Sequence, residues 1–277
     1  MAHTITSMAL FCDFENIALG VRDAKYAKFD IDRVLERLLL KGSIVVKKAY
    51  CDWDRYKEFK APMHEASFEL IEIPHIRISG KNSADIRLVV DALDLCYTKS
   101  HVDTFVIISG DSDFSPLVSK LRENNKTVIG VGVKSSTSDL LIANCDEFIY
   151  YDDLVRQEEK KKQRARRKPT PAKQPTDAPK AAVKPEQAEE DRKQKAFDLV
   201  IDTLEALAGE RDQDEKIWGS MVKQALKRRD PGFNESYFGF RTFSDLLEEA
   251  QQRKLLTLES DQKSGGYIIR RTAQRSD

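Results

Sequence analysis

Two short apolar runs, each leading to aspartate, constrain the fold of this chain more than any other feature. The first covers residues 8–13 and ends at Asp13, and the second covers residues 105–109 and leads to Asp111 and Asp113. Near-continuous apolar runs are typical of parallel strands buried on both faces, and sites in such sheets lie beyond the carboxyl ends of the strands. We therefore expect these aspartates at the functional edge of a parallel sheet.

Strand-like and helix-like segments alternate from about residue 5 to residue 153, which predicts an α/β fold. The expected strands are Met8–Asp13, Ser43–Tyr50, Phe68–Ile73, Thr104–Ser109, Thr127–Val133 and Glu147–Tyr150. The expected helices are Ile31–Leu40, Trp53–Ala66, Ala84–Thr98, Phe114–Asn124 and Ser138–Asn144. Right-handed crossovers between such strands produce a three-layer α/β/α sandwich around a mainly parallel sheet.

The rest of the chain divides at a change of composition. Residues 156–192 are basic and rich in Pro, Ala and Lys, which predicts a flexible linker, either a solvated spacer or also a weak electrostatic tether for nucleic acid. Residues 193–277 contain three helical patterns followed by two short strands, the pattern of a small winged-helix domain. The expected domains are therefore 1–155, the linker 156–192, and 193–277.

Composition excludes several classes of protein. Basic and acidic residues both number 46, so the chain is not a uniformly polycationic nucleic-acid binder. The four cysteines lie far apart, which argues against a zinc module and a disulfide framework. There is neither a signal-like start nor an apolar stretch of membrane length, so a soluble, cytoplasmic protein without a membrane partner is expected.

The acidic residues predict a divalent-metal site. Asp13 ends a buried strand, where an acid has little structural use, and Asp85 lies in the first turn of a predicted helix. Carboxylates crowded at one edge repel each other unless a cation lies among them, and Mg²⁺ or Mn²⁺ prefers such oxygen ligands. Asp113 could also cap the helix that follows it. Asp91 lies about 240° around the helix from Asp85, so its role, supporting or merely structural, is left open.

Three motifs resemble those of the NYN domains, a PIN-like ribonuclease group, and in particular its LabA-like branch. They are Asp13-Phe-Glu-Asn16, Lys81-Asn-Ser-Ala-Asp85 with Asp91, and Ile108-Ser-Gly-Asp-Ser-Asp-Phe114. The resemblance covers about residues 5–153. It implies a PIN-like sheet, with Asp13, Asp85, Asp111 and Asp113 as catalytic and metal-binding residues. It also implies that Asn16 positions a ligand or substrate and that Asp91 contributes to the acidic set, while Ser109 and Lys81 are expected to support the site.

Residues 193–272 resemble the OST-HTH, or LOTUS, domain, a winged helix that serves as an RNA- or protein-binding module. The similarity rests on the segments Trp218–Phe233 and Tyr237–Leu247. Four basic residues are candidates for nucleic-acid contact, although a solvated face is an equally good interpretation: Lys223, Lys227, Arg228 and Arg241. Phe240 and Phe243 are expected in the core, because a small helical domain needs large apolar side chains.

The function predicted from these features is metal-dependent hydrolysis of phosphodiester bonds, with Mg²⁺ or Mn²⁺ as the cofactor and RNA as the expected partner. The residues themselves do not distinguish RNA from DNA, and the oligomeric state is left open. One alternative is a magnesium phosphatase of the haloacid-dehalogenase type with Asp13 as nucleophile, although Glu15 replaces the aspartate expected two residues later. The other alternative is a non-catalytic RNA-binding adaptor.

Overall fold

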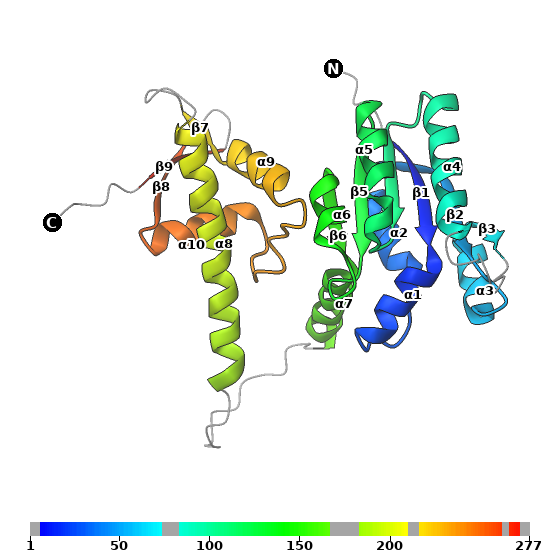
Figure 1. The fold of residues 1–277 in the computed structure, drawn as a ribbon. Coiled ribbons are helices and arrows are strands. Elements are labelled where there is room, and N and C mark those ends of the chain that lie inside the picture. The colour runs from blue at the N-terminus through cyan, green and yellow to red at the C-terminus, as the bar shows by residue number, and fades with distance from the viewer. Residues whose placement is uncertain (1–5, 74–82, 167–182, 210–215, 262–265, 272–277) are drawn as a thin grey trace, which may run out of the picture. The chain divides into compact units, whose positions relative to one another are not determined.

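We analysed a computed structural model of the chain, which describes residues 6–73, 83–166, 183–209, 216–261 and 266–271. The chain divides into two compact units, Met1–Glu159 and Lys160–Asp277, and Figure 1 labels the elements of each. In this described part of the chain, no helix has both the length and the apolar character of a membrane span.

The described strands of the first unit form a six-stranded parallel sheet in the order β3-β2-β1-β4-β5-β6. They are β1 (Ser7–Asp13), β2 (Ser43–Cys51), β3 (Glu69–Glu72), β4 (Thr104–Ile108), β5 (Thr127–Gly132) and β6 (Glu147–Tyr150). The chain winds outward in one direction from β1 to β3 and in the other from β4 to β6. Such a reversal of strand order opens a crevice at the carboxyl ends of the two central strands, here β1 and β4.

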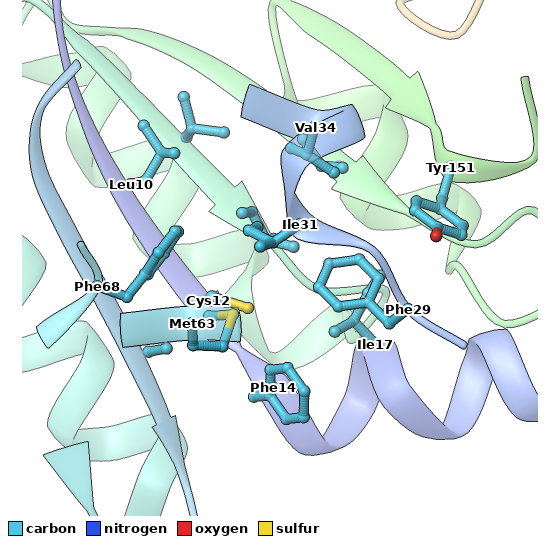
Figure 2. Packing of buried hydrophobic residues seen from close by; sticks show 14 of the residues in the cluster. Leu10, Cys12, Phe14, Ile17, Phe29, Ile31, Val34, Met63, Phe68 and Tyr151 are labelled. Carbon is cyan, nitrogen blue, oxygen red and sulfur yellow. The ribbon is translucent and has the colours of Figure 1, made fainter. Parts of the chain in front are cut away.

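Helices cover both faces of this sheet and enclose two cores. The helices are α1 (Phe14–Asp23), α2 (Ile31–Leu39), α3 (Lys57–Glu65), α4 (Ser83–Thr98), α5 (Ser115–Glu123), α6 (Asp139–Asn144) and α7 (Tyr151–Arg166), with a short 3₁₀ helix, η2 (Ser112–Phe114). Alternate residues of β1 point to opposite faces, so Leu10 and Cys12 pack with α1, α2 and α3, as Figure 2 shows. Ala9 and Phe11 pack on the other face with α4, α5 and α6. The predicted three-layer α/β/α sandwich is confirmed.

Two differences between the predicted and the observed elements have a clear physical reason. Helix α1 was not predicted, because the apolar spacing of this short segment directly follows a strand without an intervening loop. The predicted linker of residues 156–192 is partly helical, since α7 runs to Arg166 and α8 begins at Val183. Lys, Arg, Glu and Gln favour helix in the absence of Gly or Pro, and Pro185 lies in the first turn of α8, where proline is tolerated. Residues 167–182 lie outside the described part of the chain.

The second unit has the element order of a winged helix. Its described elements are α8 (Val183–Gly209), β7 (Ile217–Trp218), α9 (Gly219–Arg229), α10 (Phe243–Gln252), β8 (Leu256–Ser260) and β9 (Tyr267–Arg271). The strands form an antiparallel sheet in the order β7-β9-β8, of which β7 was not predicted. Phe240 and Phe243 are buried as expected.

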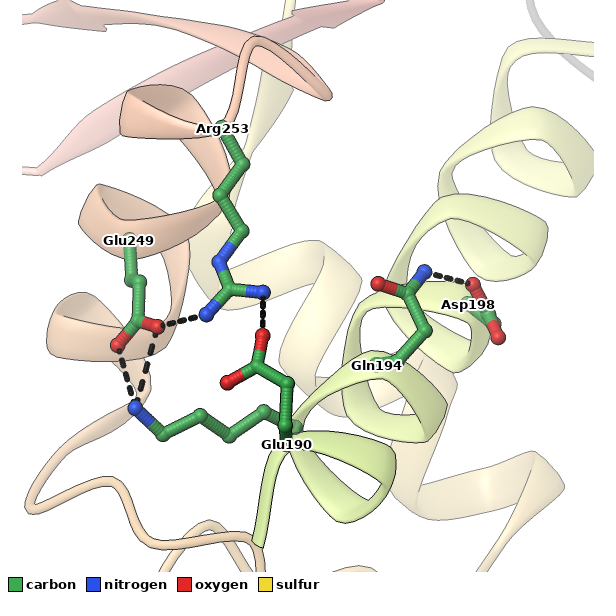
Figure 3. Close-up of polar contacts among 6 residues, drawn as sticks. Glu190, Gln194, Asp198, Glu249 and Arg253 are labelled. Atoms are coloured by element: carbon green, nitrogen blue, oxygen red, sulfur yellow. Dashed lines mark hydrogen bonds and ion pairs between the residues drawn. The ribbon is translucent and has the colours of Figure 1, made fainter. Parts of the chain in front are cut away.

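Ionic contacts join α8 to α10 at the edge of this second core. Glu249 accepts from Lys193 at 3.2 Å and from Arg253 at 2.6 Å, and Arg253 also pairs with Glu190 (Figure 3). The guanidinium of Arg253 lies 4.9 Å from the ring centroid of Phe197, which is fully buried beside Phe240. The charged network therefore covers the aromatic centre of the core.

We predict that Phe197→Ala destabilises the second unit by about 3–5 kcal/mol, because it leaves a cavity in a closed core. Hydrogen exchange followed by mass spectrometry should show faster exchange in α8, α9 and α10 and unchanged protection in β1 and β4. The matched variant Phe105→Ala, which opens the core of the first unit, should give the reverse pattern. Equal loss of protection in both units would contradict the division of the chain into two units, each with its own core.

Candidate active site at the ends of β1 and β4

Asp13 is the buried centre of the candidate site. It is the last residue of β1, retains an exposed fraction of 7% and also caps α1, since its Oδ1 accepts from the backbone N of Asn16 at 3.4 Å. The expectation that an acid here has little structural use is therefore wrong, because a strand that leads straight into a helix needs an N-cap. The same side chain can still present its remaining lone pairs to a ligand.

Two side chains tie the end of β1 to the end of β4. The hydroxyl of Ser109 donates to Oδ2 of Asp13 at 2.9 Å and accepts from the backbone N of Asp111 at 3.2 Å. The Oδ1 atom of Asn16 accepts from the backbone N of Gly110 at 2.9 Å. Ser109 therefore orients the carboxylate of Asp13, and its supporting role in a functional site stays a prediction. Asn16, predicted to position a ligand or substrate, contacts the backbone of the β4 turn.

The loop after β5 packs closely onto this junction, a feature that the sequence did not reveal. A Cβ atom at Gly110 would lie 2.6 Å from the carbonyl oxygen of Ser136, and one at Gly20 would lie 2.4 Å from the Ser136 hydroxyl. The backbone N of Ser138 also donates to the carbonyl of Gly110 at 2.9 Å. The glycines allow the loop to hold the turn before Asp111 in place.

The other acidic residues of the prediction lie at different depths. Asp85 is half-buried in the first turn of α4, and Asp111 is half-buried and caps η2 by accepting from the backbone N of Asp113 at 3.0 Å. The capping role expected of Asp113 therefore belongs to Asp111, because the turn begins one residue after Gly110. Asp113 itself is exposed.

Negative charge accumulates around Asp13. Burial raises the pKa of its carboxyl to about 7, and repulsion from Asp85 and, less strongly, Asp111 adds to this rise, while the bonds from Ser109 and Asn16 oppose it. The electrostatic coupling shows that Asp85 and Asp111 both act on Asp13. A cation at this edge would relieve the repulsion and hold Asp13 ionised at neutral pH.

Asp91 belongs to a different set of contacts. Its carboxylate accepts from the hydroxyl of Tyr50 at 2.9 Å and pairs with Lys48 at 3.3 Å and Arg87 at 3.0 Å. Burial alone would raise the pKa of Asp91, but the Tyr50 and Lys48 contacts hold it below the ordinary value. The helical phase of Asp91 thus directs it toward β2, so we interpret it as a structural link between α4 and β2.

The donor set suits a hard divalent cation. Within the described ranges, no three His, Cys, Asp or Glu side chains form a ready cluster that could hold a metal ion. Mg²⁺, however, typically takes one or two carboxylates and completes its shell with water and substrate phosphate. The buried Asp13, whose charge is disfavoured, together with Asp85 and Asp111 fits that requirement, so the four-aspartate ligand set stays a prediction.

The remaining predicted residues differ in their contacts. Lys81 lies outside the described residues. Lys223 pairs with Glu235 at 2.6 Å within its own unit, whereas Arg228 and Arg241 are exposed and Lys227 is half-buried. Sequence reasoning did not identify the pair of Glu15 with Arg55 at 3.1 Å, which lies two residues beyond Asp13.

Comparisons with known proteins agree with the motifs of the first unit. A family model described as the NYN domain matches residues 7–152. The Meiosis regulator and mRNA stability factor 1 of Xenopus tropicalis is 26% identical over 155 residues, which are 56% of this chain and 9% of that protein. An uncharacterized protein of Methanocaldococcus jannaschii is 27% identical over 117 residues, which are 42% of this chain and 45% of that protein. The chain thus spans less than half the length of these curated relatives.

Among solved structures, a protein of unknown function from Vibrio parahaemolyticus is similar to this chain. It has a TM-score of 0.49 and 27% sequence identity, and the match covers 56% of this chain and 98% of the Vibrio chain.

We predict that Asp13→Asn stabilises the first unit at neutral and higher pH. Because the folded pKa of about 7 exceeds the ordinary value of 3.8, ionisation of Asp13 opposes folding. Relative to the variant, the wild type should lose on the order of 2–4 kcal/mol as the pH rises from about 4 to about 7, and no more above that. Chemical denaturation across this pH range, in chelator, measures the difference. A gain that is equally large at acid pH would contradict the assigned cause.

We predict that Asp91→Asn destabilises the same unit by about 1–3 kcal/mol at neutral pH, because Lys48 and Tyr50 lose a charged acceptor. Since the folded pKa of Asp91 is lowered, its stabilisation exists above the ordinary pKa and is lost as the pH falls through the folded value. The difference between variant and wild type should therefore shrink in acid. Loss of divalent-cation binding with unchanged stability would instead place Asp91 in the metal site.

Proposed function

This chain belongs to the NYN domain family, whose fold is that of PIN-like nucleases, and on that premise we propose that it is a metal-dependent ribonuclease. The observation that carries the proposal is the buried carboxylate of Asp13, which lies at the switch point of the sheet under the repulsion of Asp85 and Asp111. Such an arrangement costs stability in the absence of a cation, which is typical of a site kept for chemistry.

Some residues of the site would hold the metal ion, and others orient those residues. Asp13, Asp85, Asp111 and, at the exposed rim, Asp113 would hold Mg²⁺ or Mn²⁺, which when bound lowers the pKa of a water and neutralises charge on the leaving oxygen. Ser109 fixes the orientation of Asp13 through Oδ2, and Asn16 fixes the β4 turn that presents Asp111. With water as the attacking group, the expected products carry a 5′-phosphate and a 3′-hydroxyl.

RNA as the substrate is supported by similarity to a protein named as an mRNA stability factor. The second unit, which resembles an OST-HTH domain, would contribute a further RNA- or protein-binding surface, with Arg228 and Arg241 among its exposed cations. A haloacid-dehalogenase-type phosphatase is disfavoured, because Glu15, at the position of its acid/base group, is paired with Arg55.

We predict that the wild type cleaves RNA with Mg²⁺ or Mn²⁺ and that chelator abolishes cleavage. Asp13→Asn and Asp111→Asn should each lower kcat/KM by about 100-fold or more, because several kcal/mol of charge stabilisation are lost. Labelled RNA and DNA panels with end-group analysis of the products measure this. Asp94→Asn, an exposed carboxylate on α4, is the matched control and should retain full activity.

Metal binding can be measured without turnover. Mg²⁺ should raise the melting temperature of the wild type, by mass action on the folded state, and should raise that of Asp13→Asn much less. Full cleavage by Asp13→Asn would sink the site assignment. Mg²⁺ binding without cleavage of any nucleic acid would favour the non-catalytic adaptor.

A further inference from the structure

A pocket of about 380 Å³ opens between α1 and α3, and the metal-site hypothesis does not use it. Its volume lies within the range of small-molecule sites, which is roughly 300–1,000 Å³. The residues that matter for its chemistry come from α1, the loop after it and the start of α3: Arg22, Tyr26, Lys28, Arg55, Tyr56 and Phe59.

Aromatic rings form part of the pocket wall. Tyr26, Tyr56 and Phe59 are all half-buried, so part of each ring is open to the pocket. The ammonium of Lys28 lies 4.4 Å from the ring centroid of Phe59 and donates to the backbone carbonyl of Glu58 at 3.1 Å, so a polar group already lies over this ring. A planar, polarisable group could replace that ammonium, because nucleobases stack on aromatic faces whatever their sequence.

The rim of the pocket is cationic. Arg22, Lys28 and Arg55 line it together with one acidic residue, Glu58. The side chain of Arg22 is 73% exposed and pairs with its neighbour Asp23, which is 65% exposed, an interaction worth little in water. Its guanidinium can therefore turn to a phosphate at low cost, and such contacts supply much of the affinity for nucleic acid.

The wall formed by residues 25–30 is held in place before any ligand binds. The hydroxyl of Tyr26 donates to Asp152 at 3.0 Å, and the backbone N of Asp30 donates to the hydroxyl of Tyr151 at 2.9 Å. Both partners belong to the first turn of α7. A preformed wall spares the ligand the entropy of ordering the loop.

The pocket lies about one and a half to two and a half helical turns from Asp13. Helix α1 starts directly after Asp13, and its pocket-lining residues Ala18 to Arg22 follow five to nine positions later, which is about 8–14 Å along the axis. Arg55 also links the pocket to the site through its pair with Glu15. That separation suits a nucleotide close to the scissile phosphate on the same strand.

We propose that the pocket between α1 and α3 is a nucleobase subsite, which holds one base of a single-stranded RNA on the Phe59 face while Arg22 and Arg55 contact the adjoining phosphates. This inference rests on the proposed ribonuclease function and assigns a position at which the enzyme binds its substrate. It requires that one particular base next to the cleaved bond contributes more to the binding affinity than the other bases do.

The test is a base-deletion series measured against a ring variant. The full chain, in chelator, is titrated by fluorescence anisotropy with a short single-stranded RNA and with versions that each lack one base. In the wild type, loss of the base at one position should weaken binding by roughly 5- to 100-fold. In Phe59→Leu the same deletion should cost at most about twofold, because no ring is left to stack on.

Two further variants keep the test informative. Tyr97→Leu removes an exposed ring of α4 outside the pocket and should keep the wild-type profile. Arg22→Gln is a change at the surface. It should weaken the binding of every RNA in the series and lower the slope of log K against log salt by about one. A flat wild-type profile, or a profile unchanged in Phe59→Leu, would overturn the subsite.

The outcomes separate the subsite from the proposed function. Metal-dependent cleavage with a flat deletion profile would contradict the subsite and support the nuclease function. A position-specific profile without cleavage in any metal would contradict the nuclease function and support the subsite. Adenosine monophosphate is titrated alone as well: if it binds as tightly as the RNA, the pocket is a site for free nucleotides and the RNA subsite is wrong.

Discussion

The structure of the first unit depends on how the two central strands end. Strands β1 and β4 lie side by side and parallel, yet the chain leaves them toward opposite faces of the sheet, through α1 and through η2 and α5. Main-chain pairing stops at this divergence, so side chains must connect the two turns. Ser109 bonds to the carboxylate of Asp13 and to the backbone N of Asp111, and Asn16 bonds to the backbone N of Gly110. The contacts that close the fold at this edge are therefore the contacts that orient the acidic residues.

Both aspartates cap a helical turn, since each accepts a backbone N–H at its start. At Asp13 this bond favours the ionised carboxylate. At Asp13 burial and the neighbouring carboxylates outweigh that gain. Asp111 is less deeply buried, because its turn lies one step further from the sheet. One carboxylate is thus held rigid and poorly solvated beside another that stays in contact with water. Because of this asymmetry, we expect substitution of Asp13 to change the stability of the first unit more than substitution of Asp111 does.

The parallel sheet and the position of the acidic residues at its edge could be predicted from sequence, because the strands are buried on both faces and their apolar runs are unambiguous. The position of Asp85 also followed from the local pattern of a helix start. Asp91 was ambiguous because helical phase shows that it turns away from Asp85 but not which strand it meets, and the answer depends on Lys48 and Tyr50 of β2. The close fit of Ser136 against Gly20 and Gly110 is a long-range contact without local signature. Composition alone does not reveal the helical parts of the predicted linker, because Lys, Arg and Glu are typical both of solvated spacers and of helices.

Cations near an acidic centre can guide a polyanion toward it, and the basic residues between Lys47 and Lys60 differ in their contacts. Lys48 is paired with Asp91 and Glu69, and Lys60 faces Asp54 and Glu72, so their charges are largely offset within the fold. Arg55 is paired with Glu15 as well, but it lines an open pocket that Arg22 and Lys28 share. The exposed cations Arg22, Lys28 and Arg55 therefore lie on the α1 side of the site, together with the aromatic side chains of the pocket. An RNA strand that approaches from that side contacts the cations before the carboxylates. This order offsets the repulsion between a polyanion and an acidic centre.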